Sequence, residues 1–343
     1  MPRELVALAP RTPVLQEYVV PPLQPSEVRV QTEFSAPKHG TELGLYHASA
    51  PSSRARWDRE LGLFLPDPER QPFPLPLGNM GVGTVTAVGA AVTAFQVGDR
   101  VFGHMPVREV QTVPAQRLRL LPSGMTPQAA VCLDPAEFAL GAVRDAHIRL
   151  GDHVAVFGCG AIGLLALQMA RLQGAAVLFA VDPLPVRRQV AQQLGADAVF
   201  DPATEADIGL ALKLANGRRG LDVAIEASGS YAALQAALRS LGFGATLVTV
   251  AVYKQATPDL VLGAEWHHNR IRMVSSRANS DPNPDHPRWS DARIVETAFT
   301  LLRDGKVATE PLVTPIVPFA ECVAAYQAID EHPEQSIKLG ITY

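Results

Sequence analysis

Three glycines with the spacing of a phosphate-binding loop stand near the middle of the chain. Gly158, Gly160 and Gly163 form a G-x-G-x-x-G string, with Ala161 and Ile162 between the last two glycines. In this spacing the first glycine permits a tight turn, the second lets a pyrophosphate approach the backbone, and the third lets a helix pack closely on a strand. The start of the following helix offers N–H groups to phosphates. The string therefore predicts a dinucleotide-binding loop.

An acidic residue follows where a ribose-binding carboxylate is expected. Asp182 ends the next apolar run, nineteen residues after Gly163, close to the spacing of about 20 that is typical of such sites. A carboxylate there accepts hydrogen bonds from a ribose 2′-hydroxyl and repels a 2′-phosphate. We therefore expect NAD as the cofactor, with NADP less favoured. Arg187 and Arg188 follow, and two roles stay open for them: flanking the adenine, or recovering some affinity for NADP.

A second glycine cluster, LGNMGVGTVTAVG at residues 77–89, has a different context. It stands among short strand-like runs and leads into no helix. Its glycines therefore indicate turns and close backbone approaches rather than a phosphate loop.

The elements around these motifs fall into two classes. Residues 1 to about 130 alternate with period two and break at glycines and prolines, which predicts short antiparallel strands in a barrel-like arrangement. From residue 153 to about 250, short apolar runs alternate with amphipathic helices, one of them closed by Gly174. This alternation predicts βαβ units and a parallel sheet with helices on both faces.

Length and composition limit the function classes. A chain of 343 residues is long enough for two domains, and a net charge of −4 gives no electrostatic case for nucleic acid. The three cysteines lack Cys-x-x-Cys spacing, which argues against disulfides and a four-thiolate zinc lobe. No signal peptide or membrane-spanning run is present. We expect a soluble, cytoplasmic protein that acts on a small molecule.

Several stretches together resemble the medium-chain dehydrogenase/reductase superfamily, especially its sorbitol, threonine and alcohol dehydrogenase-like branch. They are GTEL at 40, PLGNMGVGTVTAVGAAVTAFQVGDRVFG at 76, FGCGAIGLLALQMARLQGA at 157, DVAIEASG at 222 and SIKLG at 336. The resemblance implies an α/β protein with a GroES-like antiparallel β-barrel catalytic domain at residues 1–145 and 276–343. It also implies a Rossmann doubly wound cofactor domain at residues 146–275, a homodimer or homotetramer, and dehydrogenase activity on CH–OH groups.

In zinc-dependent members of this superfamily, a cysteine, a Gly-His-Glu stretch and a later acidic or cysteine residue hold the catalytic metal. The resemblance puts His39 in the place of the cysteine, and Asn79 and Met80 in the places of His and Glu. Asp134 matches the third ligand of the sorbitol-dehydrogenase-like branch. An amide and a thioether do not suit tetrahedral zinc, which needs three donors from Cys, His and carboxylates. We therefore expect a member that holds no zinc.

Without a metal, a side chain must move the proton of the alcohol, and histidine, with an ordinary pKa of about 6.5, suits this task. By the resemblance, His39 is the acid/base and Thr41 hydrogen-bonds the substrate oxygen. Asp134 would orient His39, and Asn79 would bind a substrate hydroxyl. Lys38 is a competing acid, ranked lower because alternation in an extended segment would point it away from His39.

Two further residues are cofactor-binding candidates. Ser228 follows the strand-like run DVAIEA, at the carboxyl edge where ligands gather in open α/β sheets, and is expected to line the nicotinamide-ribose pocket. Lys338 matches a basic residue that reaches the pyrophosphate in relatives. The segment between residues 43 and 76 either caps the cleft or is an ordinary solvated loop.

These observations predict a zinc-independent, NAD-dependent dehydrogenase that interconverts a secondary alcohol and its ketone. The substrate would be a polyol, a sugar derivative or a specialised metabolite. Two alternatives stay open. One is NADPH-dependent reduction of an activated C=C bond, as in the quinone and enoyl reductase branch, against which Asp182 argues. The other is an NAD-binding module that has lost its catalytic centre.

Overall fold

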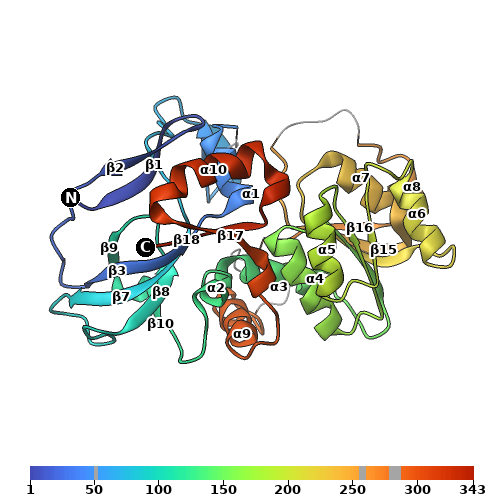
Figure 1. Cartoon of the computed structure of the whole chain (residues 1–343). Coiled ribbons are helices and arrows are strands. Elements are labelled where there is room, and N and C mark those ends of the chain that lie inside the picture. Colours follow the sequence, from blue (N-terminus) through green and yellow to red (C-terminus); the bar gives the residue numbers. More distant parts are fainter. Residues whose placement is uncertain (50–52, 255–259, 278–286) are drawn as a thin grey trace. The chain divides into compact units, whose positions relative to one another are not determined.

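A computed structural model describes residues 1–49, 53–254, 260–277 and 287–343 (Figure 1). The chain divides into two compact units: residues 1–131 with 313–343, and residues 132–312. We refer to them as the first and the second unit. Along the described ranges, no helix has the length and apolarity needed to cross a membrane.

The units differ from the expected domain boundaries at 145/146 and 275/276. Helices α3 (Leu133–Asp145) and α9 (Asp291–Arg303) belong to the second unit. The reason is packing, because α3 lies against both α9 and α4 (Ala161–Gln173). Sequence periodicity identifies such helices but does not say which core they cover.

The second unit is built on a parallel sheet with the strand order β13-β12-β11-β14-β15-β16. Strands β12 and β13 lie on one side of β11, and β14, β15 and β16 lie on the other, as in a Rossmann fold. This order confirms the predicted doubly wound sheet. The strands are β11 (His153–Phe157), β12 (Val177–Val181), β13 (Ala198–Phe200), β14 (Leu221–Glu226), β15 (Leu241–Thr249) and β16 (Arg272–Ser275). The further helices are α5 (Pro185–Gln193), α6 (Ile208–Ala215), α7 (Tyr231–Ser240) and the short α8 (Glu265–His268).

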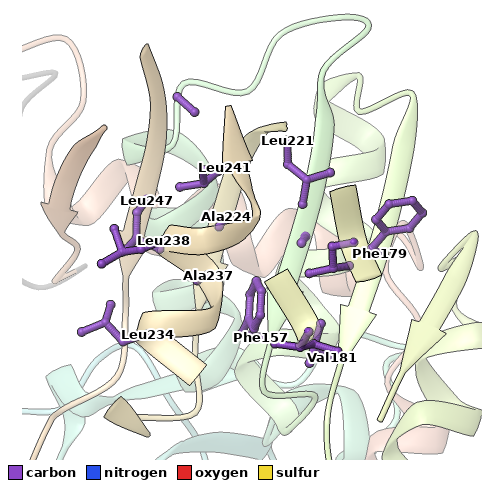
Figure 2. Close-up of a cluster of buried hydrophobic side chains, with 14 of the residues drawn as sticks. Phe157, Phe179, Val181, Leu221, Ala224, Leu234, Ala237, Leu238, Leu241 and Leu247 are labelled. Atoms are coloured by element: carbon purple, nitrogen blue, oxygen red, sulfur yellow. The ribbon is translucent and has the colours of Figure 1, made fainter. Parts of the chain in front are cut away.

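A hydrophobic core holds this sheet against its helices. Figure 2 shows Leu234, Ala237 and Leu238 of α7 in one cluster with Phe157 and Ala224 of the central strands. Each buried leucine or phenylalanine contributes about 1.5–3 kcal/mol relative to exposure. Because this packing fixes β11 and β14, it also fixes the loops that leave their carboxyl ends.

The first unit contains a mainly antiparallel sheet with the order β10-β8-β7-β3-β18-β17, and β9 also pairs with β3. Together with the parallel sheet, this confirms the predicted α/β fold with a GroES-like part. The strands are β3 (Glu27–Ala36), β7 (Met80–Val88), β8 (Arg100–His104), β9 (Val110–Pro114), β10 (Leu118–Leu120), β17 (Val313–Pro318) and β18 (Lys338–Thr342). Separate small sheets join β1 (Arg3–Ala9), β2 (Thr12–Glu17) and β6 (Leu75–Pro76), and β4 (Ala55–Asp58) with β5 (Leu63–Pro66). The helices are α1 (His39–Tyr46), α2 (Pro127–Ala130) and α10 (Cys322–Glu331).

Strand β18 brings residues from far along the chain into the first unit's sheet. It pairs antiparallel with β3, with Ile341 opposite Ser35, and parallel with β17. Leu339 and Ile341 are fully buried in a core that also contains Tyr326 of α10. This pairing sets β18 beside the segment that leads from β3 into α1.

Candidate active site

The predicted dinucleotide loop has the local geometry that its glycines require. Gly158 has φ of +88°, and a Cβ there would lie 2.7 Å from the backbone nitrogen of Ser228. A Cβ on Gly163 would lie 1.9 Å from the carbonyl oxygen of Gly158. A Cβ on Gly160, by contrast, would meet nothing within 4 Å. The first and third glycines are therefore required by the fold, whereas the space at the second is open to a ligand.

Helix α4 begins directly behind this loop, with Gly160 as its N-cap residue and Ala161 and Ile162 in its first turn. The helix ends where predicted, at Gly174, which adopts the left-handed conformation with φ of +117°. The strand–turn–helix context that the G-x-G-x-x-G string needs is therefore present.

The carboxylate of Asp182 lies at the same loop. Its Oδ2 accepts a hydrogen bond from the backbone N–H of Cys159 at 2.7 Å, and its Oδ1 accepts one from Leu184 at 2.8 Å. The side chain of Asp182 is buried. The two hydrogen bonds hold the carboxylate against the glycine loop, the position from which it would act on a ribose; that contact stays a prediction.

Both arginines of the following segment are close to Asp182. Arg188 donates to the Asp182 carbonyl oxygen at 2.7 Å and pairs with Asp201 at 2.8 Å. Nη1 of Arg187 lies 4.0 Å from Oδ2 of Asp182. Arg188 therefore supports the backbone, and Arg187 is the arginine whose charge is closest to the carboxylate.

Glu226 is a buried acid at this edge of the sheet that sequence reasoning missed. Its carboxylate accepts hydrogen bonds from the backbone N–H and hydroxyl of Ser228, the N–H of Gly229 and the hydroxyl of Tyr253. Burial raises the pKa of Glu226, and these donors oppose the rise. The carboxylate fixes the loop after β14, which touches Gly158. The sequence signal that could have identified Glu226 is its position at the end of the buried strand β14.

In the first unit, the segment around Lys38 and His39 differs from the expected extended chain. Helix α1 begins at His39, and Glu42 donates its N–H to the carbonyl oxygen of Lys38 at 2.9 Å. The alternation argument that ranked Lys38 below His39 therefore does not apply. Nε2 of His39 accepts a hydrogen bond from the N–H of Leu339 in β18 at 2.9 Å. This imidazole nitrogen is thus already engaged with the backbone.

The side chain of Lys338 is buried and binds the backbone of a distant segment. It is 3% exposed, and its Nζ donates to the carbonyl oxygen of Pro37 at 3.0 Å. Adjacent residues of β18 therefore hold both Pro37 and His39, which fixes the start of α1. The predicted contact between Lys338 and a pyrophosphate stays a prediction.

Glu42 links α1 to the second glycine cluster. Its Oε2 accepts from the N–H of Gly78 at 3.0 Å, and its Oε1 accepts from the Tyr326 hydroxyl at 2.7 Å. Burial raises the pKa of Glu42 to about 7, although the hydrogen bonds and the nearby charge of Lys338 oppose this rise. Glu42 thereby fixes the residue that precedes Asn79.

Asn79 contacts a histidine that the sequence analysis did not single out. Its Oδ1 lies 3.3 Å from Nδ1 of His104, at the end of β8. Its Nδ2 is buried and has no hydrogen-bond partner among the described residues. A buried donor of this kind would be satisfied by a bound oxygen. The pairing follows from the register of β7 and β8, in which Met80 faces His104.

The remaining predicted residues fall on separate elements. Thr41 is exposed in the first turn of α1, in the first unit. Asp134 is buried in the first turn of α3, in the second unit. The predicted support of His39 by Asp134 joins residues of different units and stays a prediction.

Comparisons with known proteins match both units. The family described as "Alcohol dehydrogenase GroES-like domain" matches residues 26–125, and "Zinc-binding dehydrogenase" matches residues 161–292. D-guloside 3-dehydrogenase of Escherichia coli (strain K12) is 43% identical, covering 99% of this chain and 100% of that protein.

Two solved structures have the same fold over the whole chain. The 2R,3R-butanediol dehydrogenase of Bacillus subtilis aligns with a TM-score of 0.79 at 20% identity, covering 100% of both chains. A putative zinc-binding dehydrogenase of Sinorhizobium meliloti 1021 bound to NADP aligns with 0.78 at 20% identity, covering 100% of this chain and 99% of that one.

The residues of this site do not fit the catalytic zinc that the second of these family descriptions implies. Nε2 of His39 already accepts the Leu339 N–H, Asn79 offers an amide, and Met80 is a buried thioether. Tetrahedral catalytic zinc needs three donors from histidine, thiolate and carboxylate. Over the described ranges, no three His, Cys, Asp or Glu side chains come together as a metal-binding group.

Proposed function

Because this chain belongs to the medium-chain dehydrogenase/reductase superfamily and is an oxidoreductase acting on CH–OH groups, we propose a more specific activity. The protein interconverts a secondary hydroxyl of a sugar, glycoside or polyol and the corresponding ketone. NAD is the hydride carrier, and no zinc takes part.

The observation that carries this proposal is the loop at Gly158–Gly163 with Asp182 fixed beside it. Two of its glycines are required by close packing, whereas the space at Gly160 is open. The residues present therefore fit a dinucleotide, with the pyrophosphate at Gly160 and the start of α4, and a ribose at Asp182. A bound nicotinamide would accept a hydride from the carbinol carbon, or return one to the ketone.

The preference for NAD rests on the charge of Asp182. Its carboxylate is held in place by Cys159 and Leu184, so it cannot turn away from a ribose 2′-phosphate without losing both hydrogen bonds. Arg187, with Nη1 4.0 Å from Oδ2 of Asp182, is a nearby cation that opposes this preference. Calorimetric titration should give tighter binding of NAD than of NADP, and equal affinities would contradict the assignment.

The substrate class is supported by a relative that matches 99% of the chain, whose name is D-guloside 3-dehydrogenase. A glycoside presents several hydroxyls, and the first unit offers polar side chains for them. Nδ2 of Asn79 is a buried donor without a partner among the described residues, and Thr41 is exposed in the first turn of α1. We assign Asn79 and Thr41 to substrate hydroxyls.

Proton transfer is assigned to a histidine in place of the metal. The sequence favours His39, which here accepts the Leu339 N–H at Nε2. Using that nitrogen as a base would break this hydrogen bond, so His39 also has a positioning role at the start of α1.

The deciding experiment is a substrate screen with sugars, glycosides and polyols, each with NAD and NADP, following the absorbance of the reduced nicotinamide. We expect turnover with NAD on one class of secondary alcohol. Absence of turnover on all of them, with NAD still bound, would favour a module that has lost its catalytic centre. Metal analysis of protein purified without chelator should find well below stoichiometric zinc; a full equivalent would contradict zinc independence.

A further inference from the structure

We propose that His104 is the proton acceptor of this site and that Asn79 is its positioning residue. The inference rests on the proposed function, because it assigns the proton-handling side chain of that reaction. Its starting point is the contact of 3.3 Å between Nδ1 of His104 and Oδ1 of Asn79.

This contact assigns a tautomer to the histidine. An amide oxygen only accepts hydrogen bonds, so with Oδ1 of Asn79 facing the ring, Nδ1 of His104 carries the proton and donates the hydrogen bond. In a neutral imidazole the other nitrogen then holds the lone pair. Nε2, on the opposite side of the ring from Asn79, is therefore the basic atom. The side chain of His104 is exposed, so a substrate has access to it.

The backbone holds Asn79 rigidly. Its N–H donates to the carbonyl oxygen of Ala36 at 3.3 Å, and its own carbonyl accepts the N–H of Met105 at 3.0 Å. These contacts tie Asn79 to the end of β3 on one side and to the residue after His104 on the other. The backbones of Asn79 and His104 are thus set beside each other, which allows the 3.3 Å side-chain contact.

The same contacts connect the strand end that carries His104 to the segment that leads into α1. Ala36 leads through Pro37 into α1, and Glu42 of α1 binds the residue before Asn79. The two histidines differ in the state of Nε2: in His39 it accepts the Leu339 N–H, and in His104 it lies away from the hydrogen bond that orients the ring. His104 can accept a proton without breaking a backbone hydrogen bond.

In the oxidation direction, the O–H bond of the substrate breaks and its proton passes to Nε2 of His104. A bound oxidised nicotinamide would accept the hydride of the carbinol carbon as the C–H bond breaks and the C=O bond forms. The two electrons lost by the alcohol would then reduce the nicotinamide. The imidazolium then carries a proton on each ring nitrogen: its Nδ1–H donates a hydrogen bond to Asn79, and its Nε2 proton is released to water. The reduction direction uses the reverse transfer.

The first test needs neither substrate nor cofactor. Long-range proton–nitrogen NMR of the ¹⁵N-labelled full chain reports the tautomer of each of the nine histidines, and His104→Gln identifies the signals of His104. We expect the Nδ1–H form. Asn79→Ala should shift it towards the Nε2–H form, whereas Asn79→Asp, which keeps an acceptor, should preserve Nδ1–H. An Nε2–H form in the unsubstituted protein would overturn the proposal.

The second test measures kinetics on the substrate found by the screen. His104→Ala should lower kcat by about 100-fold or more, leave NAD affinity unchanged, and regain part of its rate when imidazole is added. Asn79→Ala should lower kcat by about 10-fold, and Asn79→Asp should restore part of it. His332→Ala, an exposed histidine of the first unit beside Glu334, is the matched control and should behave like the unsubstituted protein.

The outcomes separate this inference from the proposed function. A protein that oxidises a secondary alcohol with NAD, and whose His104→Ala variant keeps kcat within about twofold, would retain its function and lose His104 as the base. If the protein oxidises no secondary alcohol with NAD, both the proposed function and the role of His104 as the base are contradicted. Rate loss without imidazole rescue, in a variant with altered NAD affinity, would indicate a structural effect and would also overturn the assignment.

Discussion

The hydroxyl of Tyr326 donates a hydrogen bond of 2.7 Å to the carboxylate of Glu42, joining residues 284 positions apart inside the first unit. The other carboxylate oxygen accepts the N–H of Gly78. Glu42 therefore holds together α1, α10 and the loop before Asn79, and it does so as a buried acid whose pKa is raised to about 7 by burial.

Replacement of Glu42 by glutamine should change how stability depends on pH. The pKa of this carboxyl is about 7 in the folded protein and near its ordinary value of 4.5 when unfolded. The folded state thus holds the proton more tightly, so stability falls as pH rises from 4.5 through 7, by about 3 kcal/mol in total. A glutamine does not ionise, so the stability of Glu42→Gln should not fall in this way as the pH rises. Its thermal midpoint should exceed that of the unsubstituted protein at pH 8 and lose this advantage at pH 5.

The control for that experiment is Glu331→Gln, which changes an exposed carboxylate at the end of α10. Its midpoint should follow that of the unsubstituted protein at both pH values. If Glu42→Gln also gave the same difference at pH 5 and pH 8, the raised pKa of Glu42 would be refuted.

Alanine at two glycines of the dinucleotide loop should separate folding from binding. Gly163→Ala places a Cβ 1.9 Å from the Gly158 carbonyl oxygen, so the variant should lose about 1–3 kcal/mol of stability. Gly160→Ala meets no atom within 4 Å, so its thermal midpoint should stay unchanged while NAD affinity falls by about 10-fold or more. Gly160→Ala with full NAD affinity would exclude a pyrophosphate from this loop.

Asp182→Asn should shift cofactor preference. The amide oxygen can still accept one of the two backbone hydrogen bonds, but the negative charge that opposes a 2′-phosphate is lost. We expect the ratio of NADP to NAD affinity to rise by about 10-fold, equivalent to about 1.4 kcal/mol, in calorimetric titrations. The control is Asp152→Asn, which changes the residue directly before the start of β11. An unchanged ratio in Asp182→Asn would mean that another residue sets the preference.

Lys338→Met should decide between two roles for this lysine. Loss of the Nζ hydrogen bond leaves the Pro37 carbonyl without that donor, which costs about 1–3 kcal/mol of stability. A thermal melt and an NAD titration are run on the same variant. A lower midpoint with unchanged affinity supports the structural role; weaker NAD binding at an unchanged midpoint would support the predicted pyrophosphate contact.

The strand–turn–helix geometry at Gly158–Gly163 was predictable because its signals are local. Turn, helix start and acidic residue all follow within one βαβ unit, from Gly158 to Asp182. Gly163 is crowded by Gly158, five positions before it, whereas the atoms that crowd Gly158 belong to the distant Ser228. The predicted parallel sheet and the end of α4 at Gly174 were confirmed for the same reason.

The first unit was harder to predict because its contacts join distant segments. His39 was expected in an extended segment, yet it begins α1 and binds Leu339, 300 positions away. The Asn79–His104 contact depends on the register of β7 and β8, which alternation alone does not fix. Likewise, nothing near α3 in the sequence shows that it packs with α4 and α9 rather than with the strands before it.

The place of β18 has a consequence for the order of events during synthesis. Residues 132–312 form a continuous unit that can fold as soon as it leaves the ribosome, whereas the first unit waits for residues 313–343. Until then Pro37 and His39 lack Lys338 and Leu339, 301 and 300 positions downstream. A nascent chain would therefore be able to complete the unit of residues 132–312 before the sheet of the first unit.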